Sequence, residues 1–217
     1  MLKKSYIGHT LRLFKSSELI TEKQAERIRL KIKKIRAALA AERKFFGGFY
    51  DDSRGQRYLP PRYYIQLADW TGGLTYFRWF LKNFPDDCGF GEFWLEAAII
   101  YYKSGKMDQA EMMAYRTFFS NAYVLDVFFG RPVRDKLSDL GQSHSLEFAE
   151  RLPYSAGQAG LGDFADWLEE FTGSSAFMKV RDDYTNLYQK INALNVSKER
   201  SALLKKASEL ESQYGWV

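Results

Sequence analysis

The 217-residue sequence has little of the chemistry that marks secreted or membrane proteins. It contains one cysteine, Cys88, so no intramolecular disulfide can form, which fits a reducing cytoplasm. The opening residues MLKKSYIGHTLRLFKSS hold no apolar run of about seven residues, as a signal peptide would. No stretch approaches the roughly eighteen apolar residues that span a bilayer. We therefore expect a cytoplasmic protein without a signal peptide or a membrane span.

Recognisable catalytic motifs are also lacking. The sequence has no H-E-x-x-H, P-loop or G-x-S-x-G pattern. His144 and Glu147 stand three residues apart, a spacing that two metal ligands on a helix can share, but no second histidine or cysteine lies nearby. A surface histidine is the favoured interpretation, and an enzyme with acids converging around His144 is the third alternative. We expect a non-enzymatic protein with neither metal nor cofactor.

Hydrophobic residues and positive charge are what the sequence does have. Hydrophobic residues make up 46% of the chain and aromatic residues 17%, enough for a large core rich in rings. The net charge of +5 is uneven, because residues 1–44 carry 13 Lys and Arg against 4 Glu, a balance of +9, which leaves −4 for the rest. This N-terminal arm can attract an acidic protein, nucleic acid or an anionic membrane surface.

The pattern of residues 21–46 predicts a helix. Thr21 and Gln24 have the spacing of a capping box, and Gly47 and Gly48 mark the end. Apolar residues recur every three or four positions along one face, an a/d seam that needs a partner helix. The seam consists of Ala25, Ile28, Ile32, Ile35 and Leu39. The partner comes either from this chain or from a second copy, which would make a homodimer through Ile28, Ile32 and Ile35.

The next part of the chain reads as two helix pairs. Residues 47–61 favour a loop, and Pro60 and Pro61 suit the start of a helix over about 62–70. Gly72 and Gly73 predict a break before a helix over about 74–84. Helices over 92–103 and about 108–119 follow, with Asp108 as the expected N-cap of the second. Glycine and proline markers recur after 33 and 35 residues, which is typical of a helical repeat with a period near 34.

Residues 91–122 resemble a tetratricopeptide repeat (TPR). Trp94 takes the position of the family's tryptophan, Ala97 and Ala98 those of its Leu-Gly pair, and Tyr101 that of its tyrosine. Ala110 stands at the small position of the second helix. The family's terminal proline is Ala122 here, and the preceding unit, 58–90, keeps the helix lengths but few signature residues.

The resemblance implies a scaffold that binds a protein or peptide. Such folds bind partners in a concave groove lined by the first helix of each unit. Carried over by position, the groove candidates are polar or aromatic side chains of the first helices: Tyr63, Gln66, Glu92, Glu96 and Lys103.

The whole chain is expected to form one all-α domain. Residues 1–50 would be a basic arm and helix, 58–122 two TPR-like helix pairs and 123–217 an irregular segment followed by C-terminal helices. Short helices are predicted over 146–152 and 164–171, and longer ones over 180–194 and 198–214 with Ser197 as N-cap. No segment shows the alternating pattern of a strand.

Nucleic-acid binding by the basic helix 21–46 is the alternative function. Its candidate phosphate contacts are Arg29, Lys31, Lys33, Lys34 and Arg36. Seven aromatic residues between 45 and 64 could stack on bases. A solvated helix face beside a loop whose rings enter the core explains the same pattern without any ligand.

Overall fold

A computed structural model describes residues 20–50, 55–133 and 145–215. These residues form ten α-helices, one 3-10 helix and no strand, which confirms the expected all-α class. No helix among them is long and apolar enough to cross a membrane. The first part of the basic arm, residues 1–19, and His144 lie outside the described residues.

Helix α2 (Glu22–Phe45) matches the predicted basic helix. The Gln24 amide donates to the Thr21 hydroxyl, and the Gln24 side chain accepts from the Thr21 amide at 2.7 Å, so the capping box is formed. Ala25, Ile32 and Leu39 are buried along the predicted seam. The helix packs on α3 and on the 3-10 helix η1 (Gln56–Tyr58), and Ile32 belongs to the hydrophobic core. Part of the seam therefore packs within this chain, while Ile28 and Ile35 are half-buried.

Helices α3 (Pro60–Gln66) and α4 (Trp70–Asn83) depart from the predicted boundaries. Pro60 and Pro61 open α3 as expected. The predicted break at Gly72 and Gly73 is wrong, because both lie inside α4, which Asp69 caps by accepting from the Gly72 amide. A Cβ on Gly73 would lie 2.8 Å from the Ile100 side chain. Gly73 thus serves the close packing of α4 on α5.

Helices α5 (Gly91–Lys103) and α6 (Met107–Ser120) form the central pair of the fold. The residues that carry the TPR resemblance are all buried in it: Trp94, Ala97, Ala98, Tyr101 and Ala110. Asp108 lies in the first turn of α6 and is not its N-cap, which is Lys106 without a side-chain cap. Because α6 begins at Met107, before Asp108, its N-terminus has no side-chain cap. Burial of eight of its residues stabilises the helix instead.

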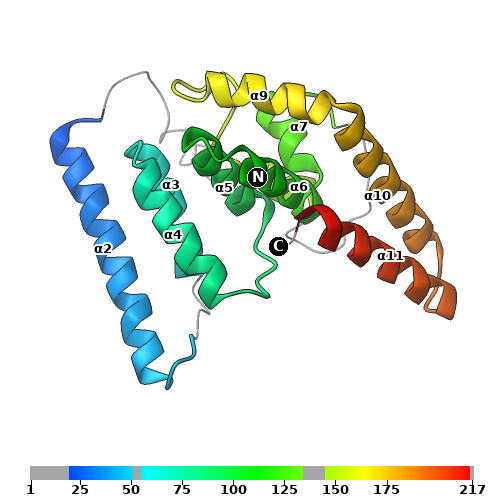
Figure 1. The fold of residues 1–217 in the computed structure, drawn as a ribbon, viewed down its shortest axis with the longest axis horizontal. Helices are drawn as coiled ribbons and strands as arrows, with labels where there is room; N and C mark the ends of the chain where they lie inside the picture. The colour runs from blue at the N-terminus through cyan, green and yellow to red at the C-terminus, as the bar shows by residue number, and fades with distance from the viewer. Residues whose placement is uncertain (1–19, 51–54, 134–144, 216–217) are drawn as a thin grey trace, which may run out of the picture.

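Five further helices complete the chain. They are α7 (Tyr123–Phe129), α8 (Leu146–Ala149), α9 (Gly162–Gly173), α10 (Ser175–Ala193) and α11 (Lys198–Gly215). Figure 1 shows the helices as successive layers, from α2 at one edge through α3 and α4 to α5 and α6 in the middle and the α10–α11 hairpin at the opposite edge. Helix α11 packs against α10 and returns to α6. Trp94, Phe77, Phe80 and Phe93 are fully buried among the rings that fill the middle.

Candidate partner-binding surface at the end of helix α2

Helix α2 presents one face to the protein and the others to solvent. Its buried face is the apolar seam, so the charged residues of the remaining faces are left exposed. The helix carries nine Lys and Arg against three Glu, a balance of +6. It stands at the edge of the layered fold in Figure 1, with its C-terminal end at the lower tip of the molecule.

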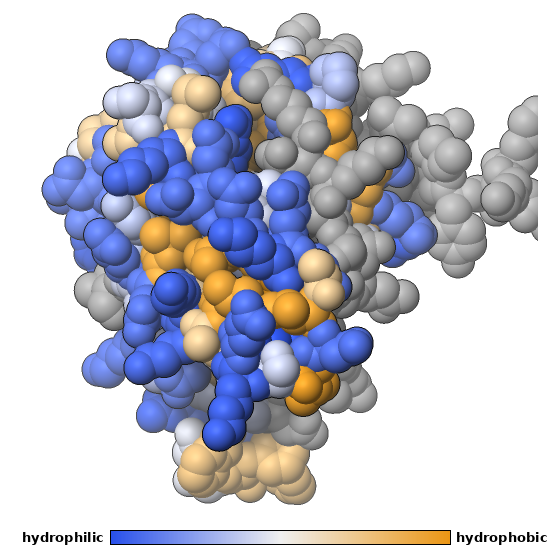
Figure 2. Space-filling model, turned by 90° about the vertical axis from the view of Figure 1, so that its right-hand side faces the viewer, coloured by the Kyte–Doolittle hydropathy of each residue, from blue (hydrophilic) through white to orange (hydrophobic). Residues whose placement is uncertain are grey.

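The C-terminal end of α2 exposes three phenylalanines. The helix ends at Phe45, and the chain then turns through Gly47 and Gly48, whose φ angles of 63° and 109° favour glycine. Phe45 and Phe49 are 82% and 78% exposed, and Phe46 is 41% exposed. Figure 2, which views the molecule from the opposite edge, shows moderately apolar surface at its lower end and a more strongly apolar band across the middle of that face. Clustered exposed rings of this kind are typical of surfaces that bind another molecule. We call these three residues the phenylalanine tip.

A pocket of about 380 Å³ opens beside the phenylalanine tip. Its residues come from two segments far apart in sequence, the end of α2 with its following turn, and the end of α4. They include Arg43, Phe49, Tyr50, Lys82, Asn83 and Phe84.

Two of the lining residues, Tyr50 and Phe84, have rings that pack together. The Tyr50 ring lies 4.7 Å from that of Phe84 and 5.9 Å from that of Trp79, between centroids. The Tyr50 hydroxyl donates to Asn83 Oδ1 at 3.4 Å, and the Arg43 guanidinium lies 6.0 Å from the Tyr50 ring centroid. The lining thus includes aromatic residues and two cationic side chains, Arg43 and Lys82.

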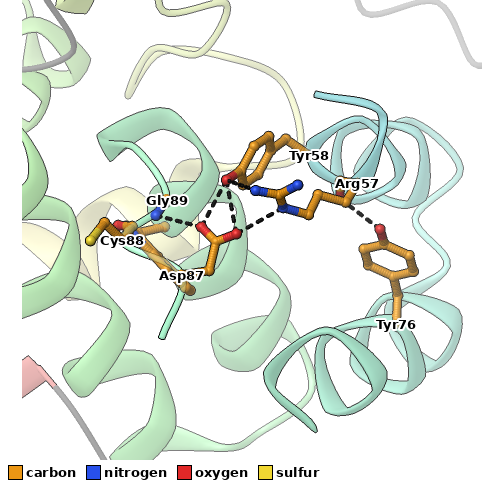
Figure 3. A network of polar contacts seen from close by, with 7 residues as sticks. Arg57, Tyr58, Tyr76, Asp87, Cys88 and Gly89 are labelled. Atoms are coloured by element: carbon orange, nitrogen blue, oxygen red, sulfur yellow. Dashed lines mark hydrogen bonds and ion pairs between the residues drawn. The ribbon is translucent and has the colours of Figure 1, made fainter. Parts of the chain in front are cut away.

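A polar network connects the segment that follows α4 to η1 (Figure 3). Asp87, which follows α4, accepts from Arg57 Nε at 2.8 Å, from the Tyr58 hydroxyl at 2.7 Å and from the Gly89 amide at 2.7 Å. The same Arg57 guanidinium lies 4.9 Å from the Phe84 ring centroid. Burial and the carboxylate of Asp87 raise the pKa of Tyr58 above its ordinary value, so its hydroxyl stays a donor even in alkaline solution. The network fixes Phe84 and so the shape of the pocket.

The predicted groove residues lie on α3 and α5, which pack against each other. Tyr63 and Gln66 are half-buried on α3, and Lys31 Nζ lies 5.5 Å from the Tyr63 ring centroid. Lys103 forms an ion pair with Asp163 of α9. Tyr63 and Lys103 therefore contact neighbouring parts of the chain.

Glu92 and Glu96 are engaged inside the protein. Arg62 of α3 forms an ion pair with Glu92 and lies 3.4 Å from Glu96 Oε1, to which the buried Tyr154 hydroxyl donates at 2.8 Å. Glu96 is 1% exposed and cannot touch a partner in this conformation. Burial raises its pKa to about 7, and the attraction of Arg62 and the hydrogen bond from Tyr154 oppose the rise.

The five predicted phosphate contacts are all exposed on α2. Arg29 Nη1 pairs with Glu22 at 2.6 Å, Lys31 faces Tyr63, and the charge of Arg36 acts on the Tyr64 hydroxyl. Lys33 and Lys34 form no ion pair with any described residue. The sequence therefore identified an exposed cationic surface, on which Lys33 and Lys34 have no ion-pair partner among the described residues.

The phenylalanine tip and its pocket were not predicted. The only signal was the density of aromatic residues between 45 and 64, which the sequence could not divide into buried and exposed rings. Comparison of the chain with protein-family models, curated proteins and solved structures finds no match. In the described ranges, no group of three or more His, Cys, Asp or Glu is arranged to hold a metal ion.

Proposed function

We propose that this protein is a non-enzymatic, TPR-like helical scaffold that binds a protein or peptide partner. The observation that carries the proposal is the phenylalanine tip, because two rings about four-fifths exposed are costly to keep in water unless a partner covers them. The burial of the TPR signature positions between α5 and α6 supports the family resemblance. The proposed binding surface lies at the end of α2 and replaces the groove predicted from the resemblance.

Replacement of the tip residues tests this function directly. We expect the double variant Phe45→Ser/Phe49→Ser to keep its folding stability within about 0.5 kcal/mol, because both rings are exposed. The amount of partner captured by the variant should nevertheless fall at least about tenfold, which is the size of effect expected for a binding hot spot. The measurement is quantitative affinity capture of the tagged full chain from nuclease-treated host lysate, followed by binding of the purified partner.

A matched control uses exposed apolar residues at the opposite edge. Val196 and Leu204 are 96% and 37% exposed on the α10–α11 side, so Val196→Ser/Leu204→Ser removes exposed apolar surface elsewhere. This control should capture the same partner as the unaltered chain. Equal capture by all three proteins would refute the assignment of binding to the phenylalanine tip.

Nucleic-acid binding remains the second candidate function, favoured by Lys33 and Lys34, which are exposed and form no ion pair with a described residue. If α2 binds phosphates, Lys33→Glu/Lys34→Glu should weaken binding of a labelled 20-nucleotide strand and lower the slope of log K against log salt by about two, one for each lost contact. Fluorescence anisotropy between about 50 and 200 mM salt measures both. Lys205→Glu/Lys206→Glu on α11 carries the same charge change as a control. An affinity that is the same for both variants would exclude α2 as the contact.

A further inference from the structure

We propose that residues 150–161, the segment between α8 and α9, form a strap that opens when Glu96 loses its proton and so exposes the Glu96 carboxylate. This inference goes beyond the proposed function, because it concerns α3 and α5 and not the phenylalanine tip. Opening brings Glu96, which the TPR resemblance placed in a groove, to a position where a partner can reach it.

The strap is anchored by one buried side chain. Among residues 150–160, all of which the structure describes, only Tyr154 is fully buried. Its hydroxyl donates to Glu96 Oε1 at 2.8 Å. The strap backbone is also tied to α7, because the Ala156 amide donates to the Phe128 carbonyl at 2.9 Å. Departure of the Tyr154 side chain from its site would therefore release the middle of the strap.

The rest of the strap is loosely held. Residues 152–155 adopt neither helix nor turn. Gly157 and Gly160 lie in open space, where an added Cβ would meet no other atom within 4 Å. The strap returns to the core at Leu161, which is buried directly before α9. A segment with one anchoring side chain between exposed flanks opens at a lower free energy than the helices that it covers.

The carboxyl of Glu96 links this opening to pH. Glu96 is buried between Tyr154 and Arg62 of α3, and Arg62 also forms an ion pair with Glu92, one turn earlier on α5. Burial raises the pKa of Glu96 to about 7, against the attraction of Arg62 and the hydrogen bond from Tyr154. Opening admits water, which favours the ionised carboxylate. The closed strap is thus favoured most in acid and loses this advantage as pH rises through about 7.

Other titratable side chains near α5 and the strap face partners of their own. On the helices packed against α5 they include Tyr64 of α3 beside Arg36, Tyr76 of α4, which donates to the Arg57 carbonyl, Arg116 of α6 beside the Trp94 ring, and Asp163 of α9, which pairs with Lys103. On the strap itself, Glu150 is exposed and Arg151 pairs with Glu147.

Hydrogen exchange of the full chain, resolved by NMR, measures the opening. The Ala156 amide is the probe, because its hydrogen bond to the Phe128 carbonyl breaks when the strap leaves. We expect its protection factor, which corrects for the intrinsic effect of pH on exchange, to fall at least about tenfold between pH 5 and pH 8.5. The amide of Ile99, which is fully buried on α5, should stay at least about tenfold more protected than Ala156 at both pH values.

Variants assign the fall to Glu96 and Tyr154. Glu96→Gln has no proton to lose, so the protection of Ala156 should change less than about threefold between the two pH values. Tyr154→Ala removes the anchor and should leave Ala156 poorly protected at both. Ser155→Ala, at an exposed neighbour, is the matched control and should behave as the unaltered chain does. If Tyr154→Ala fails to fold, Tyr154→Phe replaces it and should lower the protection of Ala156 at pH 5 by at least about threefold.

Two results would overturn the inference. Equal protection of Ala156 and Ile99 would show that the strap opens only when the whole protein unfolds. A fall in protection that persists in Glu96→Gln would show that another group controls the opening. The proposed function is tested separately, by partner capture with Phe45→Ser/Phe49→Ser, so either proposal can fail while the other stands.

Discussion

Replacement of Trp94 by alanine is expected to lower the free energy of unfolding by about 4 kcal/mol, in the range measured for buried tryptophan and phenylalanine side chains. Trp94 is fully buried, with its ring 4.9 Å from that of Phe93. Its indole donates to the Cys88 carbonyl at 2.8 Å, and the Arg116 guanidinium lies 3.8 Å from its ring centroid. The substitution therefore leaves a cavity, an unpaired carbonyl and a buried cation without its ring.

Chemical denaturation of the full chain measures this loss. Trp94→Phe keeps most of the packing but removes the indole donor, and we expect about half the effect of alanine. Trp70→Ala is the matched control, because Trp70 is half-buried at the start of α4. A cost below about 1 kcal/mol for Trp94→Ala, or a cost equal to that of Trp70→Ala, would contradict the central place given to this residue.

The stability of the protein is expected to fall as pH rises from about 5 to 8 because of Glu96. Its pKa is about 7 in the fold and 4.5 without the fold's influence, so the folded state holds this proton more tightly. The favourable contribution is fully present below the unfolded value, declines between the two values and is absent above the folded one. The difference between these two pKa values corresponds to a change in the free energy of unfolding of roughly 3 to 4 kcal/mol.

Glu96→Gln isolates this contribution. The glutamine keeps an oxygen that can accept from the Tyr154 hydroxyl, and Arg62 keeps its ion pair with Glu92. Free energies of unfolding at pH 5 and pH 8.5 should therefore differ less in the variant than in the unaltered chain, by up to about 3 kcal/mol. Glu147→Gln, at an exposed ion pair with Arg151, should leave the pH dependence unchanged. A variant with the pH dependence of the unaltered chain would show that Glu96 is not the titrating group.

The sequence predicted those parts of the fold that depend on local signals. The capping box at Thr21 and the apolar seam of α2 lie within one helix, and both formed as expected. The predicted break at Gly72 and Gly73 was wrong. Gly73 lies inside a helix because the Ile100 side chain of another helix packs against it and leaves no room for a Cβ atom. The prediction of Asp108 as the N-cap of α6 was wrong, because the helix begins one residue earlier, at Met107. An N-cap pattern in the sequence does not show where tertiary packing makes a helix begin.

The candidate site was also predictable only where it depends on local sequence. The cations of α2 follow from composition and helical spacing, so their exposure could be expected. Glu96 was predicted to line a partner-binding groove from the TPR resemblance. In the structure, helices pack on α5 from several sides, and the Glu96 partner Tyr154 lies 58 residues away in sequence. Phe45 and Phe49 are exposed while the nearby Tyr50 packs on the end of α4. This difference depends on the position of α4 in the fold, so the local sequence could not predict it.

Helix α2 is held mainly by α3 and the 3-10 helix η1, whereas α5 is enclosed by the core. In native-state hydrogen exchange, the amides of α2 should thus open at a lower free energy than those of α5, as a separate cooperative unit. The pocket joins Arg43 of α2 to Lys82 of α4, so a bound ligand ties this unit to its neighbour. Slower exchange along α2 then becomes a direct reporter of occupancy, even for a ligand that moves no helix.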